Sequence, residues 1–149
     1  MSVIERRYRA RGWLMAAGYP GTPLTKKLGI TDGSTVALIA EPGEFRGLLR
    51  PIPDGVEFRT SLRSRADVVV FFVVRRAEIQ RRIDAAGRAI FPGGGLWIAW
   101  PKRASKVPTD MTEDVVREVV LPLGLVDNKV CAISDVWSGL RVVWRRELR

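Results

Sequence analysis

The sequence contains no histidine and a single cysteine, Cys131. Because imidazole is the usual general base near neutral pH and a common zinc ligand, its absence excludes Ser-His-Asp and Cys-His catalytic systems and His-containing zinc sites. A single thiol excludes disulfide bonds within the chain and cysteine-rich metal clusters. The adjacent acids Glu113 and Asp114 are explained by helix capping, so no acid and base pair stands out. We therefore expect no metal site and assign no catalytic residue.

Long apolar runs are also missing. No run approaches the roughly 20 residues that cross a bilayer, and the first 18 residues hold no uninterrupted apolar stretch of signal-peptide length. These absences predict a cytoplasmic protein with no membrane partner. A chain of 149 residues is long enough for one domain with a buried core. We expect a basic N-terminal arm over 1–20, followed by a single domain over 21–149.

Acidic residues are scarce relative to basic ones, with 16 Asp+Glu against 25 Lys+Arg and a formal net charge of +9. Such a charge suits a partner that carries phosphate, either an anionic small molecule or a nucleic acid. It also arises from genome composition, and it keeps a domain soluble. The basic residues are spread along the chain in small clusters, so the charge does not decide between these explanations. No pattern in the sequence indicates the oligomeric state.

Apolar patterns predict alternating strands and helices. Continuous apolar runs at 34–40, 67–74 and 96–100 are typical of buried strands, and 55–59 alternates like a short exposed strand. Helical spacing occurs at 22–29, 45–49, 79–90 and 113–123. Two further strands, 129–133 and 140–144, are close enough in sequence to form an antiparallel hairpin. Strands separated by helices predict right-handed crossovers and a mostly parallel sheet.

Several residues make local predictions about these elements. Thr22 suits the N-cap of the first helix, and Gly29 suits its left-handed end. Thr112 precedes two acids and is expected to cap the last helix. Glu78 and Arg82 have the spacing of an ion pair on the exposed face of their helix.

The stretch from 67 to 98 carries a first resemblance. The strand at 67–74, the helix after it, and the turn Phe91-Pro92-Gly93-Gly94-Gly95 before the strand at 96–100 are similar to the region around the fourth and fifth strands of S-adenosylmethionine-dependent methyltransferases. The similarity covers about half of the chain. It implies a compact Rossmann-like α/β fold, a three-layer sandwich whose mostly parallel sheet ends in a C-terminal antiparallel hairpin. It also implies S-adenosylmethionine as a possible cofactor.

A second resemblance spans about 18–147 and is to a small bacterial family, the domain-of-unknown-function family numbered 3052. Four stretches carry it: Gly21-Thr22-Pro23-Leu24 with Lys26-Lys27-Leu28-Gly29, Trp97-Ile98-Ala99-Trp100-Pro101-Lys102, Gly124-Leu125-Val126-Asp127-Asn128-Lys129-Val130-Cys131, and Trp137-Ser138-Gly139-Leu140. This family has no assigned activity, so the resemblance implies no function.

The segment after the first predicted strand departs from the methyltransferase pattern. Those enzymes carry an Asp/Glu-x-Gly-x-Gly loop, whose glycines let the backbone approach the cofactor, whereas this chain reads Glu41-Pro42-Gly43-Glu44-Phe45. Arg59 and Thr60 stand where an acid usually holds the ribose, and Arg75-Arg76 replaces the Asn/Asp-Pro-Pro-aromatic motif. We therefore expect no cofactor, and predict a non-catalytic ligand-binding or interaction domain for an anionic, phosphate-bearing partner. The alternatives are an atypical S-adenosylmethionine-dependent methyltransferase and a basic nucleic-acid-binding protein that uses its terminal arms.

Open α/β sheets bind ligands beyond the carboxyl ends of their strands, near the point where strand order reverses. If the first, third and fourth strands are neighbours, one rim collects the ligand-binding candidates Glu41, Arg75, Arg76, Trp100, Lys102 and Arg103, joined by Lys106 from the same loop. Such a basic, aromatic-edged cleft suits a phosphate or carboxylate ligand with a flat ring. The alternative is that the two arginines are solvated and that the tryptophan belongs to the core.

Trp137, the stretch 127–129 and Cys131 are the remaining positions of interest. Trp137, in the predicted hairpin loop, either caps the core or binds a ligand, because an exposed indole at a loop tip costs solubility. The stretch Asp127-Asn128-Lys129 is either a polar site or an Asx-type turn that enters a strand. Cys131, between two apolar residues, is expected to be a small buried hydrophobe.

Overall fold

A computed structural model describes residues 22–149, so the expected basic arm over 1–20 lies outside the described residues. One sheet of six strands, in the order β2-β1-β3-β4-β6-β5, runs through this part of the chain. The strands are β1 (Thr35–Ile39), β2 (Glu57–Arg59), β3 (Val68–Phe72), β4 (Gly95–Pro101), β5 (Leu125–Ala132) and β6 (Trp137–Trp144). The first four are parallel, and β6 pairs antiparallel with both β4 and β5. The mostly parallel sheet with a C-terminal antiparallel hairpin is thereby confirmed.

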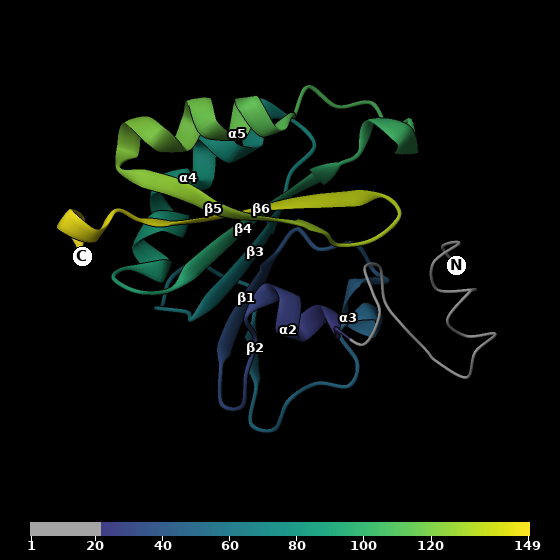
Figure 1. The fold of residues 1–149 in the computed structure, drawn as a ribbon, viewed down its shortest axis with the longest axis vertical. Coiled ribbons are helices and arrows are strands. Elements are labelled where there is room, and N and C mark those ends of the chain that lie inside the picture. Colours follow the sequence, from purple (N-terminus) through teal and green to yellow (C-terminus); the bar gives the residue numbers. More distant parts are fainter. Residues whose placement is uncertain (1–21) are drawn as a thin grey trace.

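Helices cover both faces of the sheet, which confirms the three-layer arrangement (Figure 1). On one face lie α2 (Leu24–Leu28) and α3 (Phe45–Leu48), and on the other lie α4 (Arg76–Ile90) and α5 (Glu113–Val120). Short 3-10 turns follow β4, α5 and β6: η1 (Arg103–Ser105), η2 (Leu121–Leu123) and η3 (Arg146–Leu148). Among residues 22–149, no helix has the length and apolar content that crossing a bilayer requires.

The short helix α2 is fixed at both ends. The backbone N–H of Lys27 donates to the carbonyl of Pro23 at 3.1 Å, which makes Pro23 the N-cap, one residue later than the expected Thr22. At the other end Gly29 takes a left-handed φ of 83°, as predicted, and the N–H of Ile30 donates to the Thr25 carbonyl at 2.8 Å.

A buried indole ties α2 to the sheet. Trp97, in β4, is fully buried and donates from Nε1 to the carbonyl of Leu28 at 3.0 Å. This bond satisfies one of the carbonyl groups that the end of a helix leaves without a partner. The end of α2 is therefore held directly over β4.

The start of α4 differs from the sequence prediction. Glu78 does not pair with Arg82; its Oε1 accepts hydrogen bonds from the backbone N–H groups of Val74 and Arg75, at 2.8 and 2.7 Å. The first N–H groups of a helix have no partner within it, so a carboxylate in the first turn gains more there than on the exposed face. At α5, the predicted cap is confirmed, because Thr112 Oγ1 accepts from the N–H of Val115 at 3.1 Å.

The C-terminal hairpin is longer than predicted and contains an irregularity in β5. Asp127 lies opposite Val142 and Lys129 opposite Arg141, so Asn128 is an extra residue on β5. The extra residue turns Asp127 and Lys129 to opposite faces: Asp127 pairs with Arg117 of α5 at 3.2 Å, and Lys129 donates to a carbonyl of α2. The predicted Asx-type turn is therefore wrong, and this stretch is a bulge within the strand.

Candidate ligand-binding edge

The strand order reverses between β1 and β3. From β1 the chain crosses to β2 on one side and later returns to β3 on the other, where Ile39 lies opposite Phe71. Because β4 follows β3 in the sheet, the expected adjacency of the first, third and fourth strands is confirmed. Their carboxyl ends share one edge, the usual place for a ligand in a sheet of this kind.

The turn after β1 fixes the first candidate residue, Glu41. Ala40 takes a left-handed φ of 57°, a conformation that costs an alanine about 1 to 2 kcal/mol. The Glu41 carboxylate then accepts two hydrogen bonds from the Arg46 guanidinium, at 2.9 and 3.3 Å. The hydrogen bond to Glu41 raises the pKa of Arg46. The guanidinium also lies 5.2 Å from the centroid of the Phe58 ring.

Two of the three fixed positions of the Asp/Glu-x-Gly-x-Gly loop are present in this turn. Glu41 holds the acidic position, and Gly43 holds the first glycine position, where an added Cβ would meet no atom within 4 Å. Phe45 stands at the second glycine position, is 1% exposed, and packs edge-on against Phe72 with ring centroids 4.8 Å apart. The edge therefore fits a cofactor at Glu41 and Gly43, while the third position anchors α3 in the core.

Of the two arginines after β3, only Arg76 is less available than expected. Arg75 is exposed, whereas Arg76 Nη1 pairs with Glu118 at 2.7 Å and its backbone N–H donates to Asp110 Oδ1 at 2.7 Å. A cation in the first turn opposes the helix dipole, and an anionic neighbour relieves that cost. At α4 the protein supplies that anionic neighbour itself, as Glu118 and Asp110, so Arg76 is no evidence for an external anion.

A cleft of ≈ 440 Å³ lies beyond the carboxyl end of β4. It brings together Trp100, Arg103 and Lys106, with Glu113 at the start of α5 on its wall. Trp100 is 8% exposed and belongs to the core on the α4 and α5 face, so it serves both as core and as cleft wall. Glu113 pairs with Arg117 at 2.8 Å, and this hydrogen bond raises the pKa of Arg117.

Glu41, Arg75 and Arg76 do not line this cleft, and neither do Lys102 and Trp137. Lys102 is held through its backbone, whose N–H donates to the carbonyl of Val136 at 2.7 Å, and its side chain is absent from the cleft wall. Trp137 is the first residue of β6 rather than part of a loop, and its ring packs edge-on against Phe72 at 5.0 Å. The prediction that Trp137 lies in a loop is therefore wrong, and its indole caps the core on the α2 face.

Sequence reasoning missed a second group of basic side chains. Lys26, Lys27, Lys129 and Arg141 line a cavity on the α2 face, together with Asn128. These residues come from α2 and from the two hairpin strands β5 and β6, about one hundred positions further along the chain. The sequence nevertheless carries a signal, because a polar site is one of the two interpretations of Asp127-Asn128-Lys129.

Comparison with known proteins finds similar solved structures but no matching family. No family model matches the chain and no curated protein is similar to it, so the resemblance to family 3052 stays a prediction. Among solved structures, a methyltransferase of Aquifex aeolicus that depends on S-adenosylmethionine (SAM) is 13% identical, with a TM-score of 0.54 over 80% of this chain and 86% of that one. Magnesium protoporphyrin IX methyltransferase of Synechocystis with bound SAM is 10% identical, with a TM-score of 0.53 over 82% and 74%.

A third solved structure, DhpI in complex with S-adenosylhomocysteine (SAH), is 14% identical, with a TM-score of 0.54 over 83% of each chain. At such identities the likeness concerns the fold alone. The chain thus has the Rossmann-like fold of S-adenosylmethionine-dependent methyltransferases, and the predicted fold class is confirmed.

Proposed function

We propose that the chain binds S-adenosylmethionine at the carboxyl edge of β1 and β3 and acts as an atypical methyltransferase. The observation that carries the proposal is the Glu41-x-Gly43 turn, which lies where the strand order reverses in a methyltransferase-like fold. When bound, this ligand supplies a methyl group on a positively charged sulfur. The residues of the edge bind and orient it, and we assign none of them a catalytic role. This proposal replaces the expectation that no cofactor binds.

Glu41 is the residue proposed to hold the amino group of the ligand. A carboxylate has about four acceptor positions, and Arg46 occupies two of them, so Glu41 keeps acceptors for a further cation. Its side chain is 19% exposed and is held in place by the Arg46 pair, which keeps one geometry before the ligand arrives. The open space beside Gly43 lets the ligand approach the backbone there.

Calorimetric titration of the intact protein with SAM and with SAH tests this proposal. We expect both to bind, and we expect Glu41→Gln to weaken binding roughly tenfold, because a hydrogen bond between charged groups is lost. Glu57→Gln is the matched control: Glu57 also pairs with an arginine, Arg59, but lies at the start of β2, and its substitution should leave affinity unchanged. The proposal fails if the folded protein binds neither compound, or if Glu41→Gln binds as well as the unmodified chain.

The cleft at the end of β4 favours a second candidate function, the non-catalytic binding of an anionic ligand with a flat ring. Arg103 and Lys106 are exposed on its wall, and within residues 22–149 neither makes an ion pair with a carboxylate. Two such cations beside the edge of Trp100 suit a phosphate group attached to an aromatic base.

The same titrations separate the two candidates when adenosine monophosphate is added as a third compound. The cleft function predicts that the monophosphate binds, that Arg103→Gln and Lys106→Gln each weaken it, and that SAM does not bind. Binding of the monophosphate that both substitutions leave unchanged would exclude the cleft as its site.

A further inference from the structure

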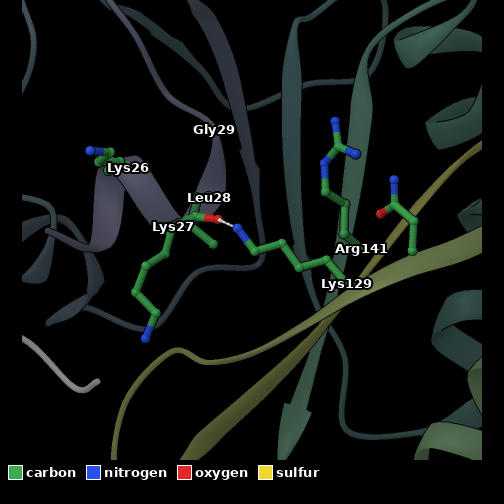
Figure 2. A pocket seen from close by; sticks show the side chains of 7 residues that line it. Lys26, Lys27, Leu28, Gly29, Lys129 and Arg141 are labelled. Carbon is green, nitrogen blue, oxygen red and sulfur yellow. Dashed lines mark hydrogen bonds between the residues drawn. The ribbon is translucent and has the colours of Figure 1, made fainter. Parts of the chain in front are cut away.

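A cavity of ≈ 230 Å³ lies on the α2 face of the hairpin, away from the carboxyl edge. Figure 2 shows the end of α2 facing β5 and β6 across it, with Lys129 reaching toward the helix and Arg141 standing beside it. Arg141 lies opposite Trp97, near the beginning of β4, whereas Trp100, in the cleft already described, lies opposite Ser138. The two cavities therefore occupy different regions of the sheet.

Local structure places the two central cations. Arg141 lies against Gly95, where an added Cβ would come within 2.5 Å of its Nε, so the guanidinium rests where a side chain would otherwise stand. Lys129 is turned to this face by the bulge at Asn128, and its Nζ donates to the carbonyl of Lys27 at 3.3 Å (Figure 2). The Lys129 head group is thereby held by a hydrogen bond, and the Arg141 head group lies in the space that the missing Gly95 side chain leaves open.

The charge of this cavity is of one sign. Its lining includes Lys26, Lys27, Lys129 and Arg141 and no acidic residue. Among the ion pairs of residues 22–149, none involves Arg141. Burial, and in addition the nearby positive charge of Arg149, lower the pKa of Arg141. A partly buried cation without a carboxylate partner is unfavourable, so an anion in this cavity would gain from it.

We propose that this cavity binds the phosphoryl group of a small phosphorylated ligand. The planar fork of a guanidinium donates two parallel hydrogen bonds to a phosphate, and ammonium groups contribute compact charges to its remaining oxygens. Here Arg141 supplies the fork, Lys26 and Lys129 supply the ammonium groups, and the Asn128 amide is a further donor. The volume is several times the roughly 30 Å³ of a water molecule, which suits one phosphoryl group and part of its ester. This site does not depend on the binding of S-adenosylmethionine.

The test is calorimetric titration of the intact protein with inorganic phosphate, with glycerol phosphate as a simple monoester, and with a single-stranded oligonucleotide. We expect the phosphate and the monoester to bind, and we expect Arg141→Gln to weaken both roughly ten- to hundredfold. Arg141→Lys keeps the charge but loses the fork and should give an intermediate affinity. Arg145→Gln, an exposed cation that does not line the cavity, is the matched control and should change nothing.

A second variant distinguishes loss of a ligand contact from loss of folding in Arg141→Gln. Lys129 is exposed, so Lys129→Gln should leave the fold intact and still weaken phosphate binding roughly tenfold. Three results would each overturn the proposal. They are no binding of phosphate or monoester, binding that Arg141→Gln and Lys129→Gln both leave as tight as in the unmodified protein, and binding of the oligonucleotide alone with an affinity that falls steeply with salt. None of these results would bear on the binding of S-adenosylmethionine, which is tested at Glu41.

Discussion

Gly94, directly before β4, and Gly95, its first residue, have different neighbours. An added Cβ on Gly94 would lie 2.8 Å from the carbonyl oxygen of Ala66 and 3.0 Å from that of Asp67. These are backbone atoms of the segment that leads into β3, and that segment is itself hydrogen-bonded to Ala89 and Thr35. On Gly95 the three atoms nearest to the same Cβ all belong to the guanidinium of Arg141, the far end of a flexible side chain.

We therefore expect Gly94→Ala to lower the free energy of unfolding by about 1 to 3 kcal/mol, the usual cost of overpacking. Gly95→Ala should cost less than about 1 kcal/mol, because the Arg141 head group can move aside. It should nevertheless weaken phosphate binding, since the guanidinium is displaced. Urea unfolding of both variants measures the stability difference, and a larger loss for Gly95→Ala would contradict this account.

Single residues show where sequence reasoning succeeds and where it stops. Cys131 was predicted to be buried and is 4% exposed; its burial raises the pKa of the thiol, although the nearby charge of Lys27 opposes this. Apolar flanking residues were sufficient evidence for that prediction. The side of the sheet that Lys129 faces was not predictable, because it depends on one extra residue in the pairing of two strands.

At the scale of elements, the start of α4 depends on a carboxylate inside the helix. Glu78 accepts from the backbone N–H groups of Val74 and of Arg75, the N-cap residue; both lie directly before the helix. We expect Glu78→Gln to destabilise the protein by about 1 to 2 kcal/mol, because two hydrogen bonds lose their charge and the interaction with the helix dipole is lost.

Glu118→Gln is the control for this prediction. Glu118 also belongs to the helical layer and pairs with Arg76 at 2.7 Å, but its side chain is 57% exposed. Exposed ion pairs contribute about 0 to 1 kcal/mol. Thermal and urea unfolding should therefore rank Glu78→Gln as the more damaging change, and equal losses would argue against a capping role for Glu78.

Most elements were predictable from hydrophobic spacing, and the main error has a physical cause. The strands β1, β3 and β4 are apolar on both faces and stand out as continuous runs. The beginning of β5 is not predictable from the sequence for two reasons. Asp127 forms an ion pair with Arg117, and the bulge interrupts the alternation of apolar and polar residues along the strand. A strand with polar contacts on both faces has no hydrophobic period to detect.

At the scale of the whole molecule, the two proposed sites lie on different parts of the sheet. The carboxyl edge of β1 and β3 is formed by crossovers, whereas the phosphate cavity is formed by the hairpin and α2. The element order predicted the edge, since it follows from parallel topology. The cavity required knowledge of which hairpin face α2 approaches, and no periodic pattern encodes that approach.

We expect the two sites to bind independently. No residue lines both, so neither ligand has a direct contact through which to change the affinity of the other. Titration with inorganic phosphate in the presence and absence of saturating SAM should give dissociation constants that agree within about twofold. Coupled sites typically change each other's affinity by about fivefold or more. A change of tenfold or more would show that the sheet couples the two regions.

The burial of Phe45 limits which substitutions the turn after β1 can accept. Phe45→Gly, which would give the turn its second glycine, would remove an aromatic ring that packs against Phe72 in the core. Loss of a buried phenylalanine costs about 3 to 5 kcal/mol, a large share of the roughly 5 to 15 kcal/mol by which most proteins are stable. A one-step substitution therefore leads through a poorly folded intermediate, and a viable path between the two loop types must first rebuild the packing beneath α3.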